Sequence, residues 1–186
     1  MANILDTIAL ERAYIARMID LLDEQLDILR DPARDPDYHL LREIARYFCH
    51  YPTAIHYPFV DTLFEYLAEL EDDLKPQVGE MKRRHDRHSL LVDEVYALLD
   101  GACSGHMIPR DRLLKEATAY VALHREHMTP TDTELFELAT ERLSSEDLEK
   151  IEKLCNQHTA PSVRSKIEEE FTRMREAIEA AHAEAA

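Results

Sequence analysis

The chain has 186 residues, with 22 Lys and Arg against 38 Asp and Glu, which gives a formal net charge of −16. This balance disfavours nucleic acid binding, because a polyanion requires a basic surface and the sequence contains no basic footprint. Only 3 glycines are present. Since the turns of β-sheets favour Gly, Asn and Asp, an all-α fold is expected.

Other features disfavour further classes of protein. The cysteines Cys49, Cys103 and Cys155 lie far apart without CxxC spacing, which argues against a disulfide framework and fits a reducing, cytoplasmic compartment. The N-terminal residues MANILDTIALERAY contain no basic segment followed by an apolar core, so no signal peptide is expected. No apolar run approaches about 18 residues, so we expect no membrane partner. The 10 histidines are the compositional anomaly.

The first three expected helices follow from apolar residues that recur at steps of three and four. The first helix is expected over 4–30, before the segment RDPARDPDY interrupts the pattern with two prolines. The second is expected over 38–72, where Pro52 and Pro58 should kink or split it. The third is expected over 75–101, and a turn to Pro109 follows.

The C-terminal half continues this pattern. A fourth helix starts near Arg110, and Pro130 interrupts it before Thr131 and Glu134 restart it as a capping box. A short helix follows Ser144, and a last one runs from about 162 to 183. Four long helices with short connections predict an up-and-down four-helix bundle. We expect one domain over 1–186, with the bundle at about 4–143 and additional C-terminal helices at about 145–184.

Polar residues on the apolar stripes are informative, because burying a polar group costs free energy unless it is paired. Three helices carry such histidines at similar depth: His56, His85, His88, His124 and His127. Arg12 interrupts the stripe of the first helix, and Asp61 and Asp132 each follow a stripe histidine by five residues. Neutral imidazole and carboxylate are the usual ligands of iron in a bundle core. The sequence therefore predicts a present or former metal site.

The simpler alternative is that each of these histidines is a hydrogen-bonded core residue, which is the usual role of a single buried histidine. Three helices that contribute histidines at matching depth favour the metal site. The other histidines follow no such pattern and are expected at the surface: His39, His50, His106, His158 and His182.

The stretch DYHLLREIARYFCHYPTAIHYPFVDTLFEYL resembles a helix of the hemerythrin-like (HHE cation-binding) family that carries His-His-Pro-x-Glu-Asp-x-x-Phe. The residues that match this pattern are His56, Pro58, Asp61 and Phe64. Tyr57 replaces the second histidine of the pattern, and Val60 replaces the glutamate.

HREHMTPTDTELFELA is similar to the family's His-Met-x-x-Glu-Glu-x-x-x-Phe-Pro-x-Ala. The residues that match are His127, Met128, Asp132, Phe136 and Ala139. Thr131 replaces the first glutamate, and Glu137 replaces the proline.

Two further stretches carry the resemblance. MKRRHDRHSLL has His85 where the family has a histidine, with Arg84 in place of the usual glutamate before it. LERAYIARMIDLLDEQL resembles the first helix of the family, in which Glu-His precedes Arg-x-x-x-Arg-Leu-Leu. Glu11 fits that pattern, and Arg12 takes the place of the histidine. The resemblance covers nearly the whole chain in the right order.

The resemblance implies two non-haem irons bridged by carboxylates, on ligand positions that include His56, His85 and His127. The carboxylates at the four-residue offset are absent. Asp61 and Asp132 lie at the five-residue offset, where an ideal helix turns them off the histidine face by about 140°. Prolines between each histidine and its aspartate can distort the helix. His88 and His124 could replace lost ligands.

Two hypotheses follow. In the first, the bundle core binds non-haem iron as a mononuclear or diiron centre, or another divalent metal, through the ligands His56, Asp61, His85, His88, His127 and Asp132. The resemblance then implies a small diatomic ligand such as O2 or NO, with binding, sensing or iron handling as the role. Arg12, Tyr57 and His124 are additional site residues.

In the second hypothesis, the protein is a metal-free interaction or regulatory protein, and Arg12 pairs with Asp61 and Asp132 in the vacated site. A protein partner or a homodimer fits this reading. Neither hypothesis implies catalysis, and the chain contains no GxGxxG, P-loop, nucleophile elbow or Ser/His/Asp arrangement.

Overall fold

The computed structural model describes residues 4–127 and 130–185, without the side chains of residues 127, 130–132, 158, 184 and 185. This part of the chain is helical and contains no strand, as the composition predicts. The α-helices are α1 (Ile4–Arg30), α2 (Tyr38–Tyr51), α3 (Tyr57–Leu70), α4 (Lys75–Cys103), α5 (Arg110–His127), α6 (Pro130–Arg142), α7 (Ser145–His158) and α8 (Pro161–Ala185).

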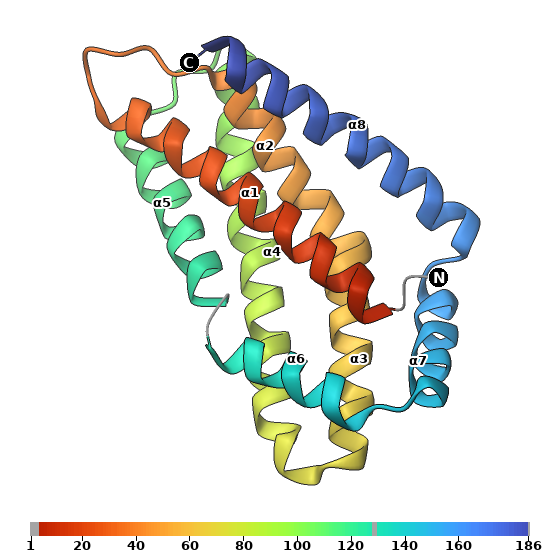
Figure 1. The fold of residues 1–186 in the computed structure, drawn as a ribbon. Helices are drawn as coiled ribbons and strands as arrows, with labels where there is room; N and C mark the ends of the chain where they lie inside the picture. Colours follow the sequence, from red (N-terminus) through yellow and green to blue (C-terminus); the bar gives the residue numbers. More distant parts are fainter. Residues whose placement is uncertain (1–3, 128–129, 186) are drawn as a thin grey trace.

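Four helical arms form the bundle (Figure 1). In chain order they are α1, α2 together with α3, α4, and α5 together with α6. Helix α1 packs against α2 and α5, and α4 packs against α2, α3 and α5, so each arm lies beside two others. The side chains between them are almost completely buried, and they include Ile8, Leu22, Phe48, Val95 and Tyr120. The predicted all-α bundle is therefore confirmed, because the stripes of apolar residues meet along one common core.

The second arm is split where the prolines predict. Helix α2 begins after Asp37, whose carboxylate accepts a hydrogen bond from the backbone N–H of Leu40 at 3.0 Å. A π-helical turn, Pro52–His56, separates α2 from α3, and the backbone N–H of Tyr57 reaches the carbonyl of Pro52. Since proline has no N–H to donate, it favours such a wider turn, and the wider turn brings His56 to the buried side.

The fourth arm is also split, at Pro130, where α6 begins. Helix α6 turns away from the direction of α5 and crosses the bundle (Figure 1). Phe136 of α6 packs edge-on against Phe64 of α3, with ring centroids 4.8 Å apart. The predicted capping box involves the side chain of Thr131, which lies outside the described residues. A capping box does start α7, through Ser144 and Asp147.

The connection between α4 and α5 differs from the predicted one in its length. Helix α4 continues through Gly101 to Cys103, so the predicted turn is shorter than expected. It passes through Gly105, whose φ of 85° lies in the left-handed region that glycine adopts without strain. Arg110 then ties α5 to the end of α1, because its guanidinium donates to the carbonyls of Ile28, Leu29, Asp31 and Arg34.

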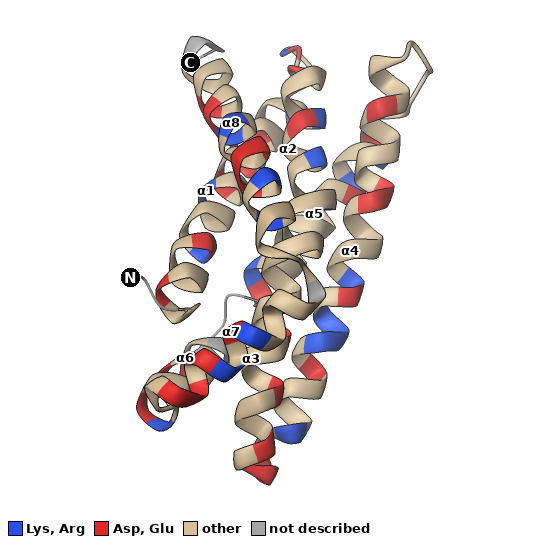
Figure 2. Ribbon diagram, turned by 90° about the vertical axis from the view of Figure 1, so that its right-hand side faces the viewer, with Lys and Arg blue, Asp and Glu red and all other residues tan. Residues whose placement is uncertain are grey.

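The C-terminal helices cover one side of the bundle. Helix α7 packs against α3, and α8 lies along α2. Acidic and basic residues are distributed over the helices, with several basic residues gathered on one stretch of α4 (Figure 2). No helix in the described part of the chain combines the length and the apolar character needed to cross a membrane.

Candidate metal centre

His56 lies at the end of the π-helical turn and is held by a buried carboxylate. Its Nδ1 lies 2.9 Å from Glu11 Oε2, and the hydroxyl of Tyr51 donates to Glu11 Oε1 at 3.2 Å. These three residues are each at most 4% exposed. Burial lowers the pKa of His56, so its ring is neutral. Because an ionised carboxylate only accepts hydrogen bonds, Nδ1 is the donor and Nε2 carries the lone pair.

His85, on α4, has the same arrangement. Its Nδ1 lies 2.8 Å from Asp61 Oδ1, and the ring is buried while the Asp61 side chain is 22% exposed. Carboxylates that hold the Nδ1–H of a histidine are the usual supports of metal-binding imidazoles, because they fix the tautomer and raise the basicity of the other nitrogen. Both imidazoles are therefore held by a carboxylate at Nδ1, as ligand histidines usually are, so Nε2 is the nitrogen that could coordinate a metal ion.

Tyr57 lies between these two histidines, at the position where the family pattern has a second histidine. Its ring stacks on His85 with centroids 4.1 Å apart and an angle of 14°, and its centroid is 6.0 Å from that of His56. Burial raises the pKa of Tyr57, so its hydroxyl stays protonated. Tyr57 is predicted from the sequence to be an additional site residue, and in the structure it is in direct contact with His85.

His88 uses both ring nitrogens in hydrogen bonds. Its Nε2 lies 3.1 Å from the carbonyl oxygen of Leu123, which can only accept, so Nε2 is the donor and Nδ1 accepts from the Tyr57 hydroxyl at 3.2 Å. Burial lowers the pKa of His88 to about 4. His88, which is predicted as a ligand, could bind a metal ion only if one of these two hydrogen bonds were broken.

His124 of α5 stacks on His88, with ring centroids 5.0 Å apart and an angle of 6°. It also packs against the rings of Phe48 and Tyr120. Burial is the main cause that lowers the pKa of His124 well below its ordinary value. The two imidazoles therefore extend the site into the core between α4 and α5 as a neutral stacked pair.

The buried position on α1 belongs to Glu11 and not, as the stripe predicts, to Arg12. Glu11 is 4% exposed, whereas Arg12 is half-buried with its guanidinium carbon 4.4 Å from the centroid of Phe136. Successive residues of a helix differ in direction by about 100°, so Arg12 lies at the edge of the seam. Its charge nevertheless lowers the pKa of His56, after the larger effect of burial.

The predicted set is thus brought together in part. His56, Asp61, Tyr57 and His85 form one connected group, while the side chains of His127 and Asp132 lie outside the described residues. Among the side chains that the structure describes, no three of His, Cys, Asp or Glu are grouped closely enough to hold a metal ion.

Most of the histidines expected at the surface lie there. His39, His50 and His106 are exposed. His182 is half-buried, and its Nε2 lies 2.7 Å from a carboxylate oxygen of Glu24. The side chain of His158 lies outside the described residues.

Glu11 and Tyr51 are the residues that sequence reasoning missed as parts of the site. Glu11 matches the first-helix glutamate of the family pattern, and that match was the available signal. Tyr51 carried no signal of its own, because a tyrosine on an apolar stripe is usually core filling.

Comparison with protein families gives a match to the hemerythrin HHE cation-binding domain over residues 3–139. That range includes α1 to α5 and most of α6, together with every residue of the group around His56 and His85. The chain belongs to the hemerythrin HHE family. Comparisons with curated proteins and with solved structures gave no match.

The described residues fit a metal ion in their donor chemistry but supply only part of a ligand set. The Nε2 atoms of His56 and His85 are two donors, and three or four protein ligands are usual for a transition metal. A bridging carboxylate four residues after His56 is absent, since Val60 is an apolar core residue, 2% exposed.

Proposed function

We propose that this protein binds one divalent transition-metal ion, with iron as the expected occupant, between α1, the kinked second arm, α4 and the break between α5 and α6. His56 and His85 would supply two ligands through Nε2, and His127 and Asp132 would complete the set. The observation that carries the proposal is the pair of imidazoles whose Nδ1 atoms are each held by a carboxylate.

Iron held by few protein ligands keeps open positions that a small molecule can occupy. The role we propose is therefore binding or sensing of O2 or NO, or handling of the iron itself. Tyr57 would limit the space beside His85, because its ring stacks on that imidazole at 4.1 Å. Glu11 and Asp61 would hold the Nδ1 atoms of the two imidazoles, which fixes the orientation of the rings and leaves Nε2 as the nitrogen that would bind the metal ion.

The test is an anaerobic titration of the metal-free protein with Fe(II), together with metal analysis of protein purified without chelator. Wild type should bind about one equivalent, as expected for one site. His56→Gln and His85→Gln should each lose most of that binding. His50→Gln is the matched control, because His50 is exposed on α2, and it should bind as wild type does. Equal binding by all four proteins would refute the assignment of the ligands.

A metal-free regulatory protein is the second candidate, and one observation favours it. Both ring nitrogens of His88 are engaged by protein groups, because Nδ1 accepts from the Tyr57 hydroxyl and Nε2 donates to the carbonyl of Leu123. Under this candidate, Arg12 would pair with Asp132 in the vacated site, and Asp61 would serve His85 alone. A wild-type protein that binds neither Fe(II), Mn(II) nor Zn(II) in the titration would favour it.

A further inference from the structure

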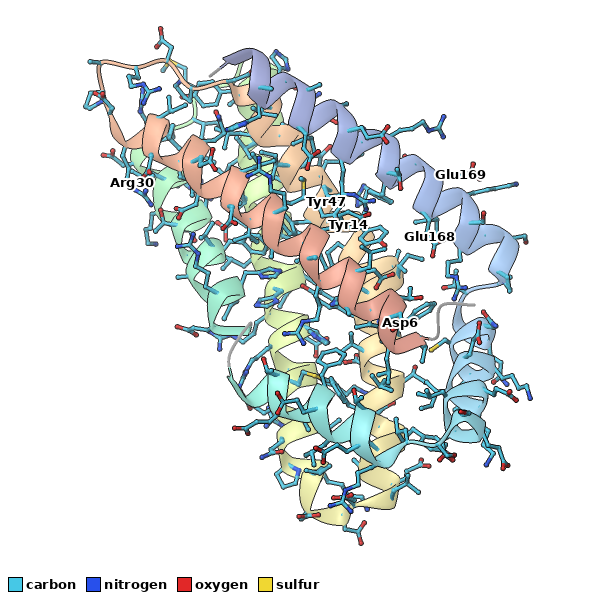
Figure 3. All side chains as sticks on the ribbon, in the orientation of Figure 1. Asp6, Tyr14, Arg30, Tyr47, Glu168 and Glu169 are labelled. Carbon is cyan, nitrogen blue, oxygen red and sulfur yellow. The ribbon has the colours of Figure 1, made fainter. Side chains whose placement is uncertain are left out.

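Helix α8 lies outside the range that matches the family domain, yet it packs along the part of the bundle that holds His56. One face of α8, spaced at three, four and seven residues, meets the bundle, and its members are Arg164, Phe171, Arg175, Ile178 and His182. Figure 3 shows Tyr14 and Tyr47 in the space between α1 and α8. The added helix is thus packed against aromatic residues of the family domain itself.

Phe171 is the apolar anchor of this face. It is 5% exposed, and its ring packs edge-on against Tyr47 and tilted against Tyr51, with centroids 5.9 Å and 5.3 Å away. Tyr47 and Tyr51 stack on each other at 5.4 Å with an angle of 18°. The position of the Tyr51 ring is therefore set from two sides, by its neighbour on α2 and by α8.

Arg175 is the charged residue of the same face that is almost completely buried. It is 8% exposed, and its guanidinium carbon lies 3.9 Å from the ring centroid of Tyr14 and 5.9 Å from that of Tyr51. The guanidinium also donates to Thr172 Oγ1 at 3.2 Å. A buried cation over an aromatic face is stabilised by the ring quadrupole, and this contact fixes the ring as well as the cation.

Tyr51 connects this cluster to the candidate metal centre. Its hydroxyl donates to Glu11 Oε1, and the other oxygen of Glu11 holds Nδ1 of His56. Burial raises the pKa of Tyr51, so the hydroxyl remains a donor. A displacement of the Tyr51 ring would therefore move or break the hydrogen bond that orients Glu11, and with it the orientation of the imidazole.

We propose that α8 closes this side of the His56 site and that Arg175 is a positioning residue, which acts through Tyr51 and Glu11 on the orientation of His56. The contacts run without interruption from α8 to the imidazole, through side chains that are each at most 8% exposed. The consequence for a metal ion rests on the proposed function, whereas the orientation of the imidazole does not.

The experiment compares Arg175→Met, which keeps the bulk and removes the charge, with Arg175→Lys, which keeps the charge. Arg173→Met is the matched control, since Arg173 is exposed on α8. Two quantities are measured on the full chain: the affinity for Fe(II), and the Nδ1–H proton resonance of His56 in the metal-free protein. Circular dichroism confirms that each variant is folded.

In Arg175→Met, the hydrogen-bonded Nδ1–H resonance should shift or broaden through faster exchange with water. The Fe(II) affinity should fall by roughly tenfold, the lower end of the effect seen for residues that support ligands from outside the coordination shell. Arg175→Lys should restore much of both readouts, and Arg173→Met should change neither.

An unchanged resonance and an unchanged affinity in a folded Arg175→Met protein would overturn the proposal, even if its melting temperature fell. If the wild type binds no Fe(II), the proposed function fails but the resonance still decides whether Arg175 positions His56.

Discussion

Replacement of Glu11 tests the group around His56 most directly. In the structure its carboxylate serves two buried partners, Tyr51 and the imidazole, at 3.2 Å and 2.9 Å. Glu11→Ala would leave the Tyr51 hydroxyl and the Nδ1–H of His56 without an acceptor. Each buried donor left unsatisfied costs about 1–3 kcal/mol, so we expect the free energy of unfolding to fall by about 4 kcal/mol. That is a large part of the stability of a typical domain, about 5–15 kcal/mol.

Glu11→Gln separates the charge from the hydrogen bonds. The amide oxygen can accept from His56 while the amide nitrogen donates to the hydroxyl of Tyr51, so both contacts can persist in weaker, uncharged form. The expected loss of stability is only about 1 kcal/mol, the difference between a charge-assisted and a neutral hydrogen bond. A metal ion on His56 should nevertheless bind about 10–100-fold more weakly, because the neutral amide no longer raises the basicity of Nε2.

The assay is urea-induced unfolding followed by circular dichroism at about neutral pH, where imidazoles in the unfolded chain are mostly neutral. Asp20→Ala is the control, since Asp20 is an exposed acidic residue of the same helix, and exposed substitutions usually change stability by less than about 0.5 kcal/mol. If Glu11→Ala destabilised the protein no more than Asp20→Ala, the buried pairing of Glu11 with His56 would be refuted.

Three other predictions concern residues nearby. The folded-state pKa of His88 is lowered to about 4 from the ordinary value of about 6.5, so His88 binds a proton more tightly in the unfolded chain. The contribution of neutral His88 to the free energy of unfolding is therefore complete above about pH 6.5 and is lost as the pH falls toward 4. His88→Gln should flatten this loss in unfolding measured from pH 7 to 4, and an equally steep loss would contradict it. Tyr57→Phe should cost about 1–2 kcal/mol, because Nδ1 of His88 loses its donor; chemical denaturation at neutral pH measures this, and a value near zero would mean that the bond is not formed. Arg12→His should tighten Fe(II) binding by about tenfold or more, since it removes a cation beside the site; parallel optical titrations of variant and wild type check this, and equal affinities would show that Arg12 does not act on the site.

The sequence by itself determined the course of the helices. The expected ranges 4–30 and 75–101 and the start at Arg110 agree with α1, α4 and α5 to within two residues. Pro52 and Pro130 correctly indicated both interruptions, because a missing backbone N–H acts locally and needs no knowledge of the rest of the chain. The stripes of apolar residues predicted a bundle for the same reason, since their period is a property of each helix alone.

The tertiary structure alone decided which neighbour each side chain meets. Glu11 and Arg12 are adjacent on α1, and an apolar stripe is broad enough that its period cannot tell which of them faces α2. The double hydrogen bonding of His88 depends on Tyr57 and on a carbonyl of α5, which are far from it in sequence. The contact of Arg175 with Tyr51 likewise joins the C-terminal helix to the kinked arm. Such long-range contacts leave no local pattern, because they are fixed only when the helices pack.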